Sequence, residues 1–143
     1  ALDIVTASDA ATPQGSEGKT ALSIAVQALS GEIAVRRGDL ATGITHFEEA
    51  VKIEDAGLYF EPPKWYYPVR HSLGAALLKA GRSAEAEKVY REDLRRFPEN
   101  GWALFGLAQA LREQGKKDDA TATEARFRKA WAETDVTLTA SRF

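Results

Sequence analysis

Apolar residues recur at intervals of three and four positions along most of the chain, frequently with alanine between them. This spacing is typical of amphipathic helices, which bury one face. The strict alternation that indicates a half-buried strand is missing, apart from the last few residues. The pattern therefore predicts an all-α protein. Its six helices are expected in antiparallel pairs at residues 20–37, 40–56, 67–80, 83–97, 101–114 and 117–132.

One short motif occurs three times along the chain. Each copy has a small residue followed two helical turns later by a glycine, which gives the pairs Gly31 and Gly38, Gly74 and Gly81, and Ala108 and Gly115. The small residue allows two helices to approach closely, and the glycine supplies the left-handed backbone that ends the first helix. A second amphipathic helix follows each glycine. The motif therefore predicts three helical hairpins.

Polar residues that accept hydrogen bonds stand where the second helices should begin. Asp39 and Ser83 follow the turn glycines, and their side chains are expected to act as N-caps. Pro98 ends the second hairpin, because proline cannot continue a helix, and Asn100 is expected to cap the helix after it. These signals place the helix boundaries independently of the apolar pattern.

The interval from Gly81 to Gly115 equals the period of the tetratricopeptide repeat, and the chain resembles that family from about Ile24 to Thr134. The resemblance implies a short right-handed α-solenoid of three antiparallel hairpins. Gly43 and Glu124 depart from the family pattern, which has alanine and an aromatic residue there; both lie in the outer repeats, where atypical residues are expected. The segments EPPKWYYPVR and TLTASRF are similar to the C-terminal part of longer bacterial proteins with many such repeats.

The chain divides into three parts on this basis. Residues 1–18, rich in small and polar residues, are expected to form a flexible lead-in. Residues 19–134 form the repeat domain, with an insertion rich in aromatics and proline at residues 58–66, and residues 135–143 form a tail. The insertion accounts for the longer interval between the first two turn glycines.

The aromatic insertion has two interpretations. Its aromatic side chains can pack against the junction between the first two repeats, which would bury a large apolar area. Alternatively, Trp65, Tyr66 and Tyr67 form the rim of a pocket in which Arg70 is a bidentate hydrogen-bond donor. Packing is the favoured interpretation.

The family resemblance implies that the first helix of each hairpin lines a concave groove for a peptide. Carrying the family's groove positions onto this chain gives Glu32, Arg36, His71, Ala75, Lys79, Trp102, Phe105, Gln109 and Arg112. Family members that bind chaperone tails hold a C-terminal carboxylate with lysine and asparagine. His71 and Ala75 stand at such places here, so recognition of chaperone tails is not expected.

Composition mainly excludes functions. The net charge of −2 argues against nucleic acid as a partner, because nucleic-acid binders normally have a basic excess. The absence of cysteine excludes disulfides and thiolate zinc sites. No apolar run approaches the roughly 20 residues of a membrane span, so no membrane insertion is expected. No cofactor is expected, and composition does not distinguish cytoplasm from periplasm.

Two weaker motifs have simpler explanations than a ligand site. Residues 13–20, PQGSEGKT, resemble a phosphate-binding loop but lack its first glycine and the surrounding parallel sheet. His46 and His71 are the only histidines, and His46 with Glu49 could supply two metal ligands, whereas a metal site needs three or four. We therefore expect neither a nucleotide nor a metal.

The functional prediction is a non-catalytic module for protein interaction or scaffolding, which presents its groove to a peptide or partner protein. The alternative is a structural C-terminal cap of a longer solenoid with no ligand of its own. A less favoured third class is an enzyme or small-ligand domain built on the insertion. A missing neighbour, or self-association through the first hairpin, would require exposed apolar residues there, such as Leu22, Val26 and Leu29.

The tail, residues 135–143, contains Val136, Leu138 and Phe143, but threonines interrupt the helical pattern. The third hairpin should therefore end near Glu133. The tail is expected to fold back on the repeats, either covering apolar surface or occupying the groove as a peptide would, with Arg142 paired to an acidic side chain.

Overall fold

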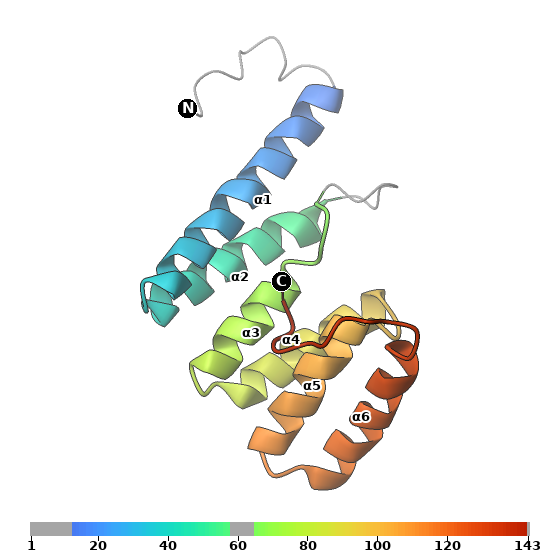
Figure 1. Cartoon of the computed structure of the whole chain (residues 1–143). Helices are drawn as coiled ribbons and strands as arrows, with labels where there is room; N and C mark the ends of the chain where they lie inside the picture. Colours follow the sequence, from blue (N-terminus) through green and yellow to red (C-terminus); the bar gives the residue numbers. More distant parts are fainter. Residues whose placement is uncertain (1–12, 58–64, 143) are drawn as a thin grey trace.

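The structure is a computed structural model that describes residues 13–57 and 65–142, with side chains from residue 18 onward. Within these residues the chain is all-helical, as predicted, and no strand occurs. The helices are α1 (Pro13–Arg36), α2 (Leu40–Ala56), α3 (Arg70–Lys79), α4 (Ser83–Arg96), α5 (Gly101–Glu113) and α6 (Lys117–Ala130). Figure 1 shows them as a row of antiparallel hairpins.

Each helix packs against the next one along the chain, and α3 also contacts α5. This order produces a solenoid of three hairpins, α1–α2, α3–α4 and α5–α6, with the first helices of the second and third hairpins side by side (Figure 1). The predicted repeat architecture is thereby confirmed for the described residues.

The helix boundaries agree closely with the prediction, except at the start of α1. This helix begins at Pro13 rather than at residue 20, so residues 13–18 are helical and do not belong to a flexible lead-in. Proline is well suited to a first helical position, because its fixed φ fits the helix and its missing N–H has no intrahelical partner there. The rest of the predicted lead-in, residues 1–12, lies outside the described residues.

The turns within the hairpins are built as predicted. Gly38, Gly81 and Gly115 have φ values of 87°, 72° and 73°, in the left-handed region that glycine adopts without strain. The Asp39 side chain accepts a hydrogen bond from the Thr42 backbone N–H at 3.0 Å.

The two other predicted caps have different outcomes. The Asn100 side chain accepts from the Ala103 N–H at 3.2 Å, as expected of an N-cap. The prediction for Ser83 was wrong, because Arg82 holds the cap position of α4. Ser83 is the first helical residue, and its hydroxyl donates to the Glu113 carboxylate on α5 instead.

Close helix contacts depend on aromatic rings that face glycine. A Cβ on Gly31 would lie 2.7 Å from the ring of Phe47, so only glycine fits there. The ring of Tyr90 lies between two glycines, and a Cβ on Gly74 or Gly106 would approach it to 2.3 or 2.2 Å. The Tyr90 ring therefore inserts between α3 and α5. These rings belong to one core that runs through all three hairpins.

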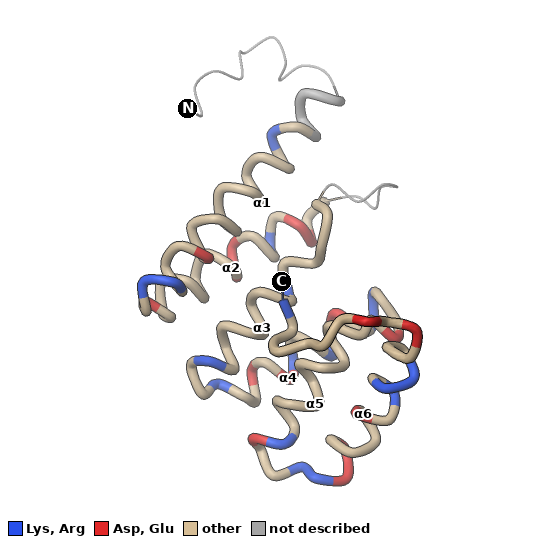
Figure 2. The backbone as a smooth tube through the Cα atoms, in the orientation of Figure 1, with Lys and Arg blue, Asp and Glu red and all other residues tan. Residues whose placement is uncertain are grey.

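The face of α1 turned away from α2 carries apolar side chains in solvent. Leu22 is 37% exposed, Leu29 62% and Ile33 41%. Figure 2 shows few charges along this helix. None of the described helices, α1 included, is both long enough and apolar enough to cross a membrane.

Candidate functional site

The candidate site is the face formed by the first helices of the hairpins, α1, α3 and α5, which we call the groove face. Two hollows lie on it. One, of about 250 Å³, is bordered by α1, the end of the insertion, α3 and the tail. The other, of about 420 Å³, lies between α5 and α6. The C-terminal tail crosses the face toward the start of α3 (Figure 1).

The first hollow brings together four of the predicted site residues. Glu32 and Arg36 come from α1, and Tyr66 and Tyr67 come from the end of the insertion. Apolar side chains of α1, Leu29 and Ile33, complete its wall, together with Ser72 and Arg142. Tyr66 is 78% exposed, so its ring is available to a ligand.

Hydrogen bonds fix the polar side of this hollow. Ser72 donates to the Glu32 carboxylate at 3.2 Å, and the Ser72 and Tyr67 hydroxyl oxygens are 3.3 Å apart. Burial raises the pKa of Tyr67. The Glu32 carboxylate also pairs with Arg142 of the tail. The Glu32 carboxylate is thus positioned by Ser72 of α3 and pairs with the Arg142 guanidinium of the tail.

The second hollow contains three more of the predicted residues, Phe105, Gln109 and Arg112. The Phe105 and Phe127 rings meet edge to face, with centroids 5.5 Å apart. Arg112 donates to Glu124 at 2.7 Å. The hollow therefore has an aromatic floor and an ion pair at its edge.

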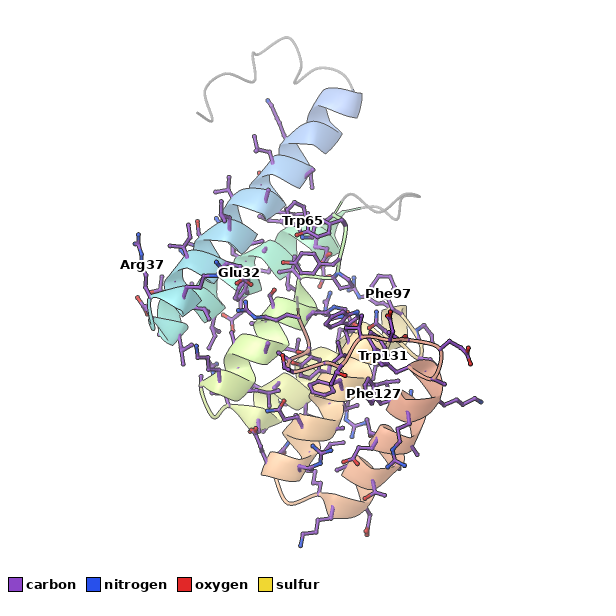
Figure 3. The ribbon with its side chains drawn as sticks, in the orientation of Figure 1. Glu32, Arg37, Trp65, Phe97, Phe127 and Trp131 are labelled. Carbon is purple, nitrogen blue, oxygen red and sulfur yellow. The ribbon has the colours of Figure 1, made fainter. Side chains whose placement is uncertain are left out.

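Aromatic side chains continue from this hollow toward the tail. Phe127 stacks on Trp131 at 5.7 Å, and Trp102, another predicted residue, meets Trp131 edge to face at 5.5 Å. Figure 3 shows Phe127 and Trp131 close together at the end of α6. The Trp131 indole N–H donates to the Val136 backbone oxygen at 2.7 Å, which fixes the start of the tail.

Two predicted site residues are buried and do not offer free groups to a ligand. Arg70 is only 6% exposed, and its guanidinium makes two hydrogen bonds to Asp55, at 2.8 and 2.5 Å. It is therefore a bidentate donor, but to the chain itself rather than at a pocket rim. His71 is 3% exposed and its Nε2 lies 3.1 Å from Asp93 Oδ2. The Arg70 side chain therefore connects α3 to α2, and the His71 side chain connects α3 to α4. Neither side chain lines the groove.

The remaining predicted residues have less distinctive positions. Lys79 is exposed in the last turn of α3, and Ala75 is half-buried on the same helix. Trp65 is half-buried and packs against the core, whereas its neighbour Tyr66 points into solvent. The end of the insertion therefore combines both interpretations, packing at Trp65 and a rim at Tyr66. Residues 58–64 of the insertion lie outside the described part of the chain.

Carboxylates gather where the second hairpin meets the first. The Glu54 carboxylate accepts a hydrogen bond from the Val69 N–H at 3.3 Å. Burial raises the pKa of Glu54 to about 7, against the opposing effects of that hydrogen bond and of Arg70. The carboxylates of Asp55 and Asp93 contribute to the rise. The raised pKa means that the Glu54 carboxylate takes up a proton near neutral pH.

The tail supplies the contacts that sequence reasoning did not assign to particular partners. Ser141 is 2% exposed; its hydroxyl lies against the Tyr90 hydroxyl and 3.4 Å from the His71 backbone oxygen. Tyr90 and Ser141 were both missed as site residues. The signal for Tyr90 was the second glycine, Gly106, which together with Gly74 makes room for a ring between α3 and α5.

The two weaker motifs are accounted for by ordinary structure. Residues 13–20 belong to α1 rather than to a loop. His46 Nδ1 lies 2.7 Å from Gln27 Oε1, which joins α2 to α1. Among the residues with described side chains, no group of three or more potential ligands converges on a metal position.

The arrangement defines a class of protein: a short α-solenoid whose first helices form a common face. Residues 71–133, from α3 to α6, match the family model of the tetratricopeptide repeat. The match supports tetratricopeptide repeats in this part of the chain, the second and third hairpins. No curated protein matches the chain. Tetratricopeptide repeats are generally non-catalytic folds for protein interaction.

Proposed function

We propose that this chain is a non-catalytic module for protein interaction, and that its groove face binds a peptide or an extended segment of a partner protein. One observation carries the proposal. An extended segment, the chain's own tail, lies on this face and engages it through a buried serine and an ion-paired arginine. A face that accommodates one extended segment in this way has the shape and the polar groups to bind another.

The hollows support the same function. The one at α1 offers a carboxylate beside apolar and aromatic side chains, and the one at α5 offers aromatic rings beside an ion pair. Apolar anchors combined with a few oriented polar groups are typical of sites that bind peptides.

Selection of binding peptides from a random library, followed by titration, tests this function. Phe105→Ala should weaken the binding of the selected peptides, because it removes part of the hollow between α5 and α6. Lys52→Ala is the matched control, since Lys52 is exposed on α2, which lines neither hollow. Peptides that bind both variants with equal affinity would place the binding surface elsewhere.

The apolar stripe on α1 favours a second candidate function, that of a structural piece that packs against another helical unit. Leu22, Leu29 and Ile33 are exposed along one side of the helix, and Val26 is half-buried between them. A second copy of the first hairpin, or a further repeat, could cover this stripe. Light scattering at increasing concentration tests self-association; Leu29→Lys should abolish any dimer formed in this way.

A further inference from the structure

The described part of the tail, residues 135–142, is held on the groove face mainly by the polar contacts of Ser141 and Arg142. Val136 is 51% exposed and Leu138 only half-buried, so apolar burial contributes little. Ser141, in contrast, is almost completely buried, and the Arg142 side chain is 24% exposed and ion-paired. Contacts of this kind depend on which side chains occupy two adjacent positions. They therefore constitute a recognition site rather than a general hydrophobic cover.

The position of Ser141 is a subsite for a hydroxyl group. The His71 backbone oxygen can only accept a hydrogen bond, so the single Ser141 proton is directed to it. The Tyr90 hydroxyl must then donate to the Ser141 oxygen. Burial raises the pKa of Tyr90, which keeps the phenol protonated as this role requires. A side chain without a hydroxyl would leave the buried Tyr90 donor unpaired.

The geometry of this subsite is rigid and small. The Tyr90 ring fits between Gly74 and Gly106, where an added Cβ would come to 2.3 or 2.2 Å from it. The phenol oxygen is therefore held in one place at the surface of the groove. Because Ser141 itself is buried, a side chain much larger than serine has no room there.

The position of Arg142 is a subsite for a cation. Glu32 receives the arginine on one carboxylate oxygen, Oε2, and the Ser72 hydroxyl on the other, Oε1, at 3.2 Å. The side chains of Glu32 and Arg142 are 22% and 24% exposed, so water screens the pair less than a surface salt bridge. The hollow beside it, walled by Leu29, Ile33 and Tyr66, has space for an apolar residue that follows the arginine.

On the basis of the proposed groove function, we propose that the partner presents an extended segment in which serine is followed by arginine and then by an apolar residue. Ser141 and Arg142 of the chain's own tail occupy the hydroxyl and cation subsites. The tail therefore competes with the partner segment, and the groove opens when the partner displaces the tail. A closed fraction of about 90–99% would lower the apparent affinity of the partner about 10- to 100-fold.

The test uses the full chain and, as probe, a fluorescein-labelled peptide with the sequence of residues 135–143, followed by fluorescence anisotropy. The double substitution Ser141→Ala, Arg142→Ala removes the side-chain contacts by which the chain's own tail holds the groove face. We expect the probe to bind this variant at least tenfold more tightly than the wild-type chain. A probe with alanine in place of serine and arginine should not bind. Arg37→Ala is the control for loss of a positive charge, because Arg37 points away from the tail (Figure 3).

Two further substitutions, made in the double variant, test the subsites. Glu32→Gln removes the charge that pairs with arginine, and Tyr90→Phe removes the phenol donor while keeping the ring. Phenylalanine is compatible with this position, since Phe47 stands in the same relation to Gly31 as Tyr90 does to Gly74. Each substitution should weaken probe binding at least fivefold, as expected for loss of a charged or buried hydrogen bond.

The outcomes separate this proposal from the groove function. Equal binding of the probe to wild type and double variant, or no binding to either, overturns the competition; library peptides that still bind through Phe105 would leave the groove function intact. Tight binding that Glu32→Gln and Tyr90→Phe do not change overturns the recognition chemistry. A wild-type dimer that becomes monomeric in the double variant would mean that tails are exchanged between copies, which overturns a separate partner.

Discussion

The first and second hairpins have the same framework but different cores. Aligning Gly38 with Gly81 superimposes their sequence positions and gives the equivalent pairs Gly31 and Gly74, Phe47 and Tyr90, Ala28 and His71, and Ala50 and Asp93. All of these paired residues are buried, and the glycine of each hairpin faces the ring of its aromatic residue. At the three positions other than glycine, the first hairpin has only apolar side chains. The second hairpin has a phenol hydroxyl, an imidazole and a carboxylate at these positions. The same hairpin can therefore be built with apolar or with polar buried side chains, because the glycine and the aromatic ring set the spacing of its helices.

The difference explains why Ser141 of the tail is buried against the second hairpin. His71 uses its side chain to bind Asp93 inside the hairpin and its backbone oxygen to accept from Ser141 on the groove face. Tyr90 likewise packs inside and presents its hydroxyl outside. The first hairpin has no such polar group at the equivalent positions. A buried polar network therefore connects the core of the second hairpin to the segment that covers the groove.

The third hairpin shows a further solution at the same place. Aligning Gly81 with Gly115 places Phe105 and Phe127 at the positions of His71 and Asp93, and their rings are in edge contact. The three hairpins therefore fill one pair of positions with two alanines, an imidazole and a carboxylate, or two aromatic rings. In each hairpin the two side chains are complementary, which indicates that the residue at one position depends on the residue at the other.

The largest effect is expected from breaking the pair that distinguishes the second hairpin. Asp93→Ala leaves the imidazole of His71 without its buried partner and should reduce the free energy of unfolding by about 4 kcal/mol. The double substitution His71→Ala, Asp93→Ala copies the alanines of the first hairpin and should cost clearly less than the sum of the two single substitutions. Urea denaturation of the four proteins measures this coupling. Additive losses would show that the pair is not a unit.

Glu54, at the junction of these two hairpins, should make stability depend on pH. Its pKa in the folded chain, about 7, lies above the ordinary value of 4.5, so the folded state binds the proton more tightly than the unfolded state. Stability is therefore highest below about pH 4.5 as far as this group is concerned, falls as pH rises to about 7, and is then constant. The full loss corresponds to about 3 kcal/mol.

The substitution Glu54→Gln tests this dependence. Glutamine keeps an acceptor for the Val69 N–H but has no charge, so the variant should melt at a higher temperature than wild type above pH 7. The difference should vanish near pH 4.5. Glu48→Gln, an exposed substitution on the same helix, is the control. A Glu48→Gln variant with the same pH profile as Glu54→Gln would contradict the assignment to Glu54.

The turn glycines test what the two hairpins share. Gly81→Val should destabilise the chain by about 2 kcal/mol, because valine does not adopt a φ of 72° without strain. No atom lies within 4 Å of the position of the missing Cβ, so the cost comes from the backbone alone. Gly38→Val should have a similar cost, since its surroundings are equally open. Thermal melting of both variants makes the comparison; a marked difference would show that the turns are not equivalent.

The sequence was sufficient for the elements and turns because these depend on local rules. Helical spacing, turn glycines and the caps Asp39 and Asn100 act within a few residues of each other. The site was less predictable, because it depends on which side of a helix faces the neighbouring hairpin. Arg70 and His71 were assigned to the candidate site, yet both side chains are drawn inward by carboxylates that stand 15 and 22 residues away.

The contact of Ser141 with Tyr90 was beyond the reach of local rules for the same reason. The two residues are 51 positions apart, and serine in a threonine-rich tail gives no indication of burial. The expected pairing of Arg142 with an acidic side chain did identify the correct kind of contact. The partner, Glu32, is 110 residues away, and only the solenoid brings the two together.

The smallest effect on global stability is expected from making the second hairpin more like the first at its aromatic ring. Tyr90→Phe removes one buried hydroxyl and leaves the packing against Gly74 and Gly106 unchanged, so the free energy of unfolding should fall by about 1 kcal/mol. The local effect should be larger, since Ser141 loses the hydrogen bond from Tyr90. Hydrogen exchange of the tail backbone, residues 135–142, should then accelerate, while exchange in α3 and α5 remains close to wild type. Uniform acceleration in the tail and both helices would mean that the hydroxyl stabilises the whole solenoid, and that the tail opens only when the repeats do.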